Sequence, residues 1–370
     1  MKPSPQQDEA MTAVSRWLKE KDSQVFRLFG YAGTGKTTLA RQIAEGVDGD
    51  VLFAAFTGKA AQVLRNKGCA NARTIHSLIY RPRGEETEDE TGETLPAFSL
   101  NRTSQVAKAE LVIIDECSMV DEELGRDLLS FGTKVLVLGD PGQLPPVSGG
   151  GFFTEAEPDI LLTEVHRQAR DNPIIDLAQT VREGGHLDYG EYGSSRVIGR
   201  DEIDAETVLS ADQVLLGINR TRHKYNRRIR ELKDFTEPYP QVDEKLVCLR
   251  NSSEKGLLNG GLWRVTSLGL SNGPAVNLLV KSEDEGPRGP SAKIRVLKEL
   301  FDKGPENVPF AKRRNSDEFD YGYALTVHKA QGSQWDDLVL FDESFAFRDT
   351  RERWLYTAIT RAAERITIVR

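Results

Sequence analysis

The first 150 residues repeat one pattern, a short apolar run followed by polar sequence of helical character. The runs are Val25–Phe29, Val51–Phe56, Leu111–Ile114 and Val135–Leu138. Each run is continuous rather than alternating, which is typical of parallel strands buried on both faces. Strands that alternate with helical stretches predict an α/β unit built on a parallel sheet.

A helix is expected at the start of the chain. Ser4 can cap it, Pro5 suits its first turn, and Gln7 completes a Ser-x-x-Gln capping box. The apolar residues that follow fall on one helical face. These residues are Ala10, Val14, Trp17 and Leu18.

Residues 77–106 interrupt the first α/β pattern with proline, glycine and acidic residues. We interpret this stretch as a small insertion, a β-hairpin that turns near Glu90–Gly92. After residue 150 a second α/β section begins, with strands expected at Val214–Ile218 and Arg365–Val369. The pattern therefore divides the chain into residues 1–150 and 151–370.

The second section is itself interrupted between about residues 238 and 320. Short β-like segments such as Lys245–Leu249 and Leu262–Val265 are separated there by Asn-Gly and Gly-Pro turns. A small barrel inserted into the second α/β unit would explain this texture.

The composition is ordinary for a soluble globular protein. No apolar run approaches the about 20 residues that span a bilayer, and no apolar signal segment opens the chain. The three cysteines, Cys69, Cys117 and Cys248, are widely spaced and form no Cys-x-x-Cys pair. This spacing fits a reducing compartment and argues against a disulfide framework or a structural zinc.

The net charge of −8 is unevenly distributed. Six acids and no base lie in residues 84–93, so the rest of the chain carries only −2. Residues 219–230 are strongly basic, and a solvated helix face is the ordinary interpretation of such a charge run. The global acidity therefore does not exclude a nucleic-acid partner.

A glycine-rich segment, Gly30-Tyr-Ala-Gly-Thr-Gly-Lys-Thr37, joins the first expected strand to the next helix. In this context it predicts a phosphate-binding loop rather than a plain glycine turn. Lys36 can reach the β- and γ-phosphates, and the Thr37 hydroxyl can hold Mg²⁺. The residues expected to contact ATP here are Gly33, Thr34, Gly35, Lys36, Thr37 and Thr38.

Polar residues follow two other strands of the predicted sheet. Asp115 and Glu116 come directly after Leu111–Ile114, and Gln143 follows Val135–Leu138. An acid at the end of a buried strand is costly unless a cation pairs with it, so we expect Asp115 to hold Mg²⁺. Glu116 is then placed to act as the general base, and Gln143 to orient water and sense the nucleotide.

The order of these motifs resembles the superfamily 1 helicases of the RecD/Dda-like branch, over nearly the whole chain. Besides the segments above, the matching motifs are Phe56-Thr-Gly-Lys-Ala-Ala61, Thr74-Ile-His-Ser77, Leu162-Thr-Glu-Val-His-Arg167, Tyr323-Ala-Leu-Thr-Val-His-Lys-Ala-Gln-Gly332 and Leu355-Tyr-Thr-Ala-Ile-Thr-Arg361. The chain resembles a minimal motor core without an accessory domain.

The resemblance implies two RecA-like P-loop lobes with parallel sheets. It implies an SH3-like insertion at 238–320 and a hairpin at 77–106 that bears a strand-separating pin. The acidic tip of that hairpin would be repelled by phosphate. Phe98 is the better candidate for a stacking residue, with core packing as an equal alternative.

The resemblance also assigns residues at the nucleotide. It implies that Gln7 reads adenine, either instead of or together with its capping role. Arg167 and Arg361 match the two arginines that the second lobe directs at the γ-phosphate, with surface salt bridges as the alternative. Gln331 and Gly332 match the segment that links the nucleotide to the DNA path.

Six further residues match positions that line the single-stranded DNA path, where they contact phosphates without reading sequence. They are Thr57, Lys59, Thr74, His76, Thr326 and His328. Helix capping or packing is the alternative role. Neither histidine has an acidic or cysteine partner at ligand spacing, so we expect no metal there.

Together these features imply an ATP-dependent, Mg²⁺-requiring DNA helicase that moves 5′ to 3′ on single-stranded DNA and opens duplexes with a 5′ tail. Lobe closure would couple hydrolysis to movement. We expect it to act as a monomer in a bacterial or phage-infected cell, with no membrane partner. The alternatives are an RNA-directed motor of the same superfamily and a nucleotide-gated DNA-binding subunit that depends on a partner.

Overall fold

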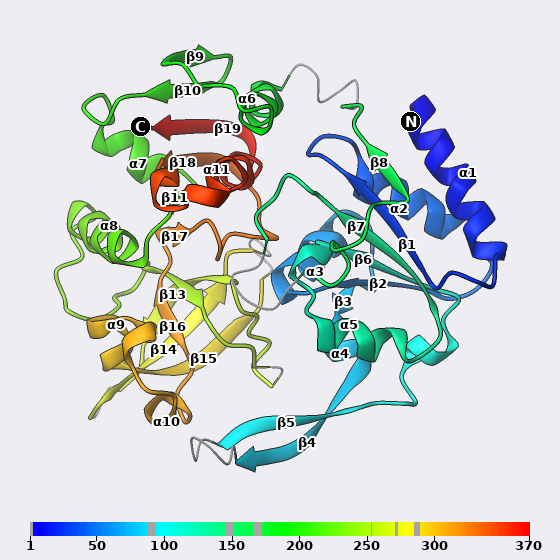
Figure 1. Cartoon of the computed structure of the whole chain (residues 1–370). Coiled ribbons are helices and arrows are strands. Elements are labelled where there is room, and N and C mark those ends of the chain that lie inside the picture. The colour runs from blue at the N-terminus through cyan, green and yellow to red at the C-terminus, as the bar shows by residue number, and fades with distance from the viewer. Residues whose placement is uncertain are drawn as a thin grey trace. The chain divides into compact units, whose positions relative to one another are not determined.

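The structure is a computed structural model that describes residues 3–87, 94–145, 151–165, 172–252, 254–270, 273–284 and 289–370. Internal contacts divide it into two compact units. The first contains Met1–Glu88, Thr94–Leu187 and Thr350–Thr360, and the second is made mainly of Asp188–Asp349 and Arg361–Arg370 (Figure 1). The lobe boundaries inferred from the sequence, 1–150 and 151–370, stay a prediction.

A six-stranded parallel sheet forms the centre of the first unit, in the order β3-β2-β6-β7-β1-β8. The strands are β1 (Val25–Gly30), β2 (Val51–Ala55), β3 (Arg73–Thr74), β6 (Leu111–Asp115), β7 (Lys134–Gly139) and β8 (Ile160–Leu162). Residues 111–114 and 135–138 are fully buried. The parallel sheet predicted from continuous apolar runs is confirmed.

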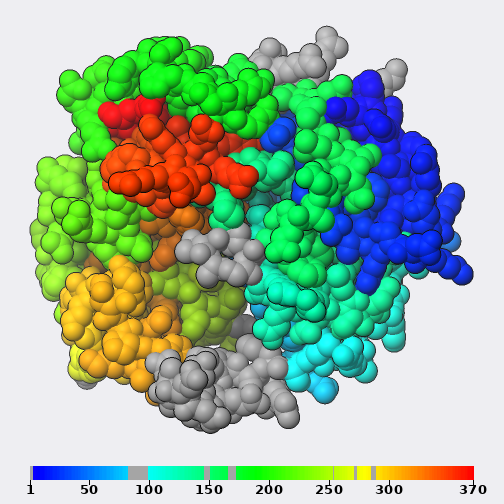
Figure 2. All heavy atoms as spheres, in the orientation of Figure 1, coloured from blue at the N-terminus to red at the C-terminus, as the bar shows by residue number. Residues whose placement is uncertain are grey.

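The first unit contains seven α-helices within the residues that the structure describes. They are α1 (Pro5–Lys19), α2 (Lys36–Glu45), α3 (Gly58–Asn66), α4 (Ile75–Ile79), α5 (Glu122–Leu129), α6 (Pro173–Arg182) and α11 (Arg351–Ile359). The capping box of α1 is confirmed, since the Ser4 hydroxyl accepts the Gln7 N–H and the Gln7 side chain accepts the Ser4 N–H. Figure 2 shows α1, in dark blue, at the surface.

The predicted hairpin insertion is present. Strands β4 (Tyr80–Thr87) and β5 (Thr94–Leu100) pair antiparallel, with a register shift between Pro82 and Gly84. The backbone of Phe98 lies opposite Pro82, and its side chain is outside the described residues, as is the turn at 88–93. The pin function of this hairpin stays a prediction.

The second unit holds another α/β sheet, in the order β17-β11-β18-β19-β10-β9. All neighbours are parallel except the edge pair β9 and β10. The strands are β9 (Gly190–Tyr192), β10 (Ser195–Ile198), β11 (Gln213–Leu216), β17 (Ala324–Thr326), β18 (Trp335–Phe341) and β19 (Ala362–Val369). Its helices are α7 (Ala205–Ser210) and α8 (Asn219–Leu232).

An antiparallel sheet of five strands accounts for the predicted β insertion, in the order β15-β14-β13-β12-β16. Its strands are β12 (Lys245–Cys248), β13 (Leu262–Leu268), β14 (Ala275–Ser282), β15 (Ser291–Leu297) and β16 (Phe319–Tyr321), with α9 (Lys298–Lys303) and α10 (Phe310–Arg313) beside them. The β character is confirmed. Its likeness to an SH3 barrel stays a prediction.

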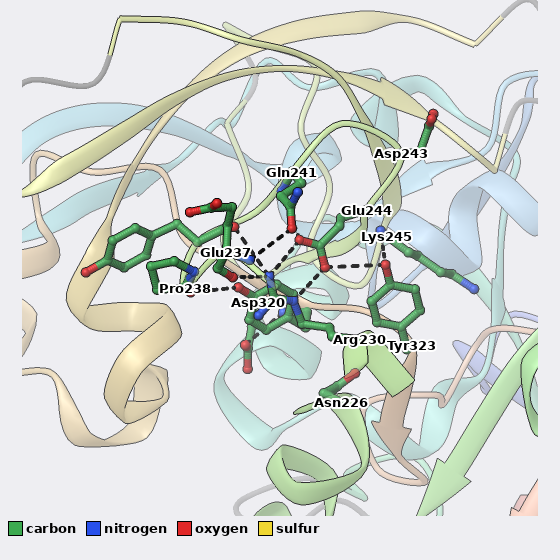
Figure 3. Close-up of polar contacts among 12 residues, drawn as sticks. Asn226, Arg230, Glu237, Pro238, Gln241, Asp243, Glu244, Lys245, Asp320 and Tyr323 are labelled. Atoms are coloured by element: carbon green, nitrogen blue, oxygen red, sulfur yellow. Dashed lines mark hydrogen bonds and ion pairs between the residues drawn. The ribbon is translucent and has the colours of Figure 1, made fainter. Parts of the chain in front are cut away.

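A buried ion pair joins this sheet to α8 (Figure 3). Both nitrogens of the Arg230 fork contact the Glu244 carboxylate, at 2.6 and 2.9 Å, and Glu244 is fully buried. Arg230 also lies over the Tyr321 ring, 4.4 Å from its centroid. A bidentate pair of this kind fixes orientation as well as distance, so it holds the β insertion to α8 in a defined orientation.

Glu244→Gln removes the charge that compensates buried Arg230. We expect it to destabilise the second unit by about 3–5 kcal/mol, the usual cost of breaking a buried pair on one side. The loss in free energy of unfolding can be measured by hydrogen exchange of the β12 amides at increasing urea concentrations.

The matched control is Glu231→Gln, which breaks an exposed α8 pair with Arg228 at 3.0 Å. That change should stay within about 0.5 kcal/mol. Equal effects of the two substitutions would contradict the structural role of the Arg230–Glu244 pair.

Candidate nucleotide and nucleic-acid sites

The phosphate-binding loop lies between the end of β1 and the start of α2, in the context the sequence predicts. Gly33 and Gly35 both adopt a φ of 79°, which favours glycine. The Lys36 ammonium donates to the carbonyls of Gly30 at 2.6 Å and Tyr31 at 3.1 Å. The loop is thus folded around the lysine that would meet the phosphates.

Asp115 and Thr37 meet beside this loop. The Thr37 hydroxyl donates to Asp115 Oδ2 at 3.0 Å, although 78 residues separate them. Glu116 has a φ of 53°, and its N–H donates to Asp115 Oδ1 at 2.9 Å. A hydroxyl and a carboxylate so close can share Mg²⁺, whose remaining ligands are usually phosphate oxygens and water. Among the described residues, no group of three or more His, Cys, Asp or Glu could hold a metal alone.

Asp140 extends the site beyond the end of β7. Its Oδ2 lies 4.0 Å from Lys36 Nζ, and its Oδ1 accepts the Gly142 N–H at 2.9 Å. Gln143 Nε2 contacts Asp140 Oδ2 at 3.5 Å, whereas its Oε1 is buried with no partner among the described residues. That unpaired oxygen is an acceptor available to a water molecule or ligand.

Gln7 packs against the loop through its side chain. Its Nε2 donates to the Thr34 carbonyl at 3.0 Å, and its Oε1 accepts the Ser4 N–H at 3.0 Å. Both ends of the amide are therefore engaged by the protein. The adenine role stays a prediction and requires one of these bonds to be shared or exchanged.

Arg361, Gln331 and Gly332 come together within the second unit. Arg361 is only 5% exposed and donates to the Ser333 carbonyl at 3.2 Å. Gln331 is buried, and Gly332 adopts a φ of 75°. The buried position of Arg361 does not fit a surface salt bridge. Arg167 lies outside the described residues.

The expected DNA-path residues of the first unit occupy helix starts. Thr57 caps α3 through the Ala60 N–H, and Thr74 caps α4 through the Ser77 N–H. Lys59 is 9% exposed. His76 packs edge-on against Phe56, with ring centroids 5.9 Å apart. The capping alternative therefore applies to both threonines, while their DNA contacts stay predictions.

In the second unit, Thr326 ends β17 and His328 follows it. The His328 ring lies 5.4 Å from that of Phe347. Burial lowers the pKa of His328, and burial, partly offset by Asp121, lowers that of His76. Both imidazoles are thus neutral at pH 7 and suited to hydrogen bonding rather than to ion pairing.

The basic stretch on α8 has a mixed role. Arg222 and Arg230 are buried and paired with Asp320 and Glu244, at 2.6 Å each. The remaining cations are exposed along the outer face of the helix, which Figure 2 shows in yellow-green. They are Arg220, Lys224, Arg227 and Arg228.

Comparison with known proteins agrees with this geometry. A family model described as an AAA domain matches residues 2–198, and one described as a UvrD-like helicase C-terminal domain matches residues 321–369. The ATP-dependent RecD2 DNA helicase of Deinococcus radiodurans is 28% identical over 91% of this chain and 46% of its own length. The ATP-dependent DNA helicase dda of phage T4 is 34% identical over 48% of this chain and 42% of its own. The chain belongs to the AAA-domain family. The relatives it resembles are named as RecD2 and dda helicases.

Solved structures of Pif1 helicases share the fold of this chain. Bacteroides Pif1 with ADP-AlF3 and single-stranded DNA has a TM-score of 0.58 and 20% identity, covering 99% of this chain and 92% of that one. Candida albicans Pif1 has a TM-score of 0.55 and 18% identity, covering 100% and 95%. At such identities the likeness shows the fold alone. The chain spans about half the length of the RecD2 and dda relatives.

The family motifs did not reveal every residue at the nucleotide site. Arg182 of α6 lies over the Tyr31 ring, 3.7 Å from its centroid, and Tyr356 of α11 contacts Asp140. Tyr356 lies inside the motif Leu355–Arg361, but no spacing rule indicates which residues its hydroxyl contacts.

No helix of the described residues is long and apolar enough to cross a membrane.

The lowered pKa of His76 predicts a pH effect on stability. In the unfolded chain an imidazole protonates near pH 6.5, whereas the folded state resists protonation. Stability should therefore be full above pH 6.5 and fall as the pH drops towards the folded pKa. We expect His76→Gln to lose less thermal stability than the wild type between pH 7 and pH 5.

Exposed His186 provides the control, because His186→Gln should leave the pH dependence of the melting temperature as in the wild type. A His76→Gln curve parallel to that of the wild type would contradict the buried, neutral imidazole.

Proposed function

We propose that this chain is an ATP-dependent DNA helicase that moves 5′ to 3′ on single-stranded DNA and opens duplexes carrying a 5′ tail. The observation that carries the proposal is the loop around Lys36 with the Thr37–Asp115 contact at 3.0 Å beside it. The names of the RecD2, dda and Pif1 relatives support the DNA substrate. Polarity rests on the branch resemblance.

ATP would be held by the loop amides of residues 33–38, with adenine against Gln7. Lys36 would turn from the Gly30 and Tyr31 carbonyls to the phosphates. Mg²⁺ fits the Thr37 hydroxyl and the Asp115 carboxylate, and when bound it would neutralise charge on the phosphate oxygens. These oxygen donors are the kind that Mg²⁺ prefers.

Hydrolysis would use the residues after β6 and β7. Glu116 would accept the proton of the attacking water, and the unpaired Gln143 Oε1 would orient that water. Arg167 and Arg361 would offset transition-state charge on the γ-phosphate, as a guanidinium does well with its fixed fork of donors. Gln331 and Gly332 would link this event to the DNA path.

Single-stranded DNA would contact capped helix starts, two neutral imidazoles and the Lys59 ammonium. Thr57, Lys59, Thr74 and His76 belong to the first unit, and Thr326 and His328 to the second. Such groups bind phosphates in any sequence, which suits translocation. Phe98 on β5 is the candidate stacking residue of the hairpin, with core packing as the equal alternative. A cytoplasmic location is supported by three buried free cysteines.

A strand-displacement assay tests the proposal and its direction together. The purified chain with Mg²⁺ and ATP should open a 5′-tailed DNA duplex and leave a matched 3′-tailed duplex closed. Lys36→Ala should abolish opening, because the γ-phosphate loses its cation, while retaining nucleotide-free binding to single-stranded DNA.

Exposed Lys21→Ala is the control and should unwind like the wild type. Opening of only the 3′-tailed substrate would overturn the direction. Opening of an RNA duplex alone would favour the RNA-directed motor, and activity only after addition of cell extract would favour a partner-dependent subunit.

A further inference from the structure

Tyr356 lies at the nucleotide site but has no role in the proposed chemistry above. It is 2% exposed on α11 and makes two hydrogen bonds of 2.8 Å through one oxygen. The hydroxyl accepts the Ala32 N–H and donates to Asp140 Oδ2. One hydroxyl therefore joins the phosphate-binding loop to Asp140, which directly follows β7, and all three residues belong to the first unit.

The same Asp140 oxygen faces the loop lysine. Asp140 Oδ2 lies 4.0 Å from Lys36 Nζ, and Gln143 Nε2 lies 3.5 Å from it. Tyr356 is thus hydrogen-bonded to an acid that itself contacts Lys36 and Gln143, the two residues assigned to phosphate binding and hydrolysis. Burial and the Asp140 charge raise the pKa of Tyr356, so its hydroxyl keeps the proton that Asp140 accepts.

Neighbouring contacts hold α11 in this position. The Thr357 hydroxyl accepts the Leu144 N–H at 2.8 Å, in the loop that carries Gln143. A Cβ added to Gly142 would lie 2.9 Å from the Tyr356 ring, so only glycine allows this approach without a shift. Two successive residues of α11 are therefore anchored to the loop after β7.

The chain on both sides of α11 belongs to the second unit, whereas α11 itself belongs to the first, within the segment Thr350–Thr360. Arg361, the proposed γ-phosphate arginine, follows Tyr356 by five residues. A change at the loop that moves Tyr356 would be passed along the chain to Arg361 and β19.

We propose that Tyr356 is a positioning residue for ATP hydrolysis, whose hydroxyl sets the Ala32 amide and Asp140 around Lys36 and so links γ-phosphate binding to α11. This rests on the proposed function. Loop amides bind phosphate oxygens, so the Ala32 N–H held by Tyr356 is a group that the γ-phosphate would compete for. Exchange of that bond would release the hydroxyl from the loop while leaving its bond to Asp140.

Tyr356→Phe removes the oxygen and keeps the ring packing. We expect the DNA-stimulated kcat for ATP to fall by about tenfold to a hundredfold, the loss usual for a hydrogen bond to a charged group. The KM for ATP and nucleotide-free affinity for single-stranded DNA should change by less than about threefold, because the phosphate cradle and DNA path keep their groups.

The matched control is Tyr323→Phe in the second unit. That hydroxyl also accepts a backbone N–H, from Lys245 at 3.2 Å, and faces a buried carboxylate, Glu244 at 3.5 Å (Figure 3). Tyr323→Phe should lower the melting temperature about as much as Tyr356→Phe does. It should leave the DNA-stimulated kcat within about twofold of the wild-type value. Equal kcat losses in both variants would show a general stability effect and overturn the proposal.

The outcomes separate this inference from the proposed function. A wild-type chain without DNA-stimulated hydrolysis would overturn the function itself. A wild-type chain that responds to DNA, with an unchanged Tyr356→Phe variant, would overturn only the role of Tyr356.

A second measurement applies if Tyr356→Phe fails to fold. With 3-fluorotyrosine at position 356, the fluorine resonance should move when Mg²⁺, ADP and aluminium fluoride are added. A resonance that does not move would overturn the proposal.

Discussion

The hydrogen bond between the Thr37 hydroxyl and the Asp115 carboxylate fixes the geometry on which the nucleotide site depends. Thr37 lies in the first turn of α2, and Asp115 is the last residue of β6, so the bond ties the loop to the sheet. Parallel pairing of β6, β7 and β1 brings Asp115, Asp140 and the loop to one edge of that sheet. Acids at the ends of buried strands are costly alone, and here they gain partners at Thr37 and Lys36.

Much of this could be read from the sequence because its signals are local. Continuous apolar runs predict buried parallel strands, and a glycine pattern between strand and helix predicts the loop. Buried pairs such as Arg222–Asp320 and Arg230–Glu244 were not predictable, because their partners are distant in the chain. A run of arginines on a helix looks solvated until the fold shows which members face inward.

The same limit applies to the site. The structure brings Thr37 and Asp115 into contact, as expected of residues near the carboxyl ends of parallel strands in one sheet, while their role in holding Mg²⁺ stays a prediction. The contact of Tyr356 with Asp140 spans 216 residues and depends on α11 joining a unit that its sequence neighbours do not join. For Gln7, Thr57 and Thr74, the structure shows the capping bonds that the sequence allowed, and the ligand contacts remain for experiment.

The central claim is that hydrolysis at this loop is coupled to nucleic acid. The most direct measurement is the rate of ATP hydrolysis by the wild-type chain with Mg²⁺, before and after addition of a single-stranded DNA oligonucleotide. The account predicts at least a tenfold rise in rate at saturating DNA, about 1.4 kcal/mol of transition-state stabilisation. A rate that is the same with and without DNA would contradict it.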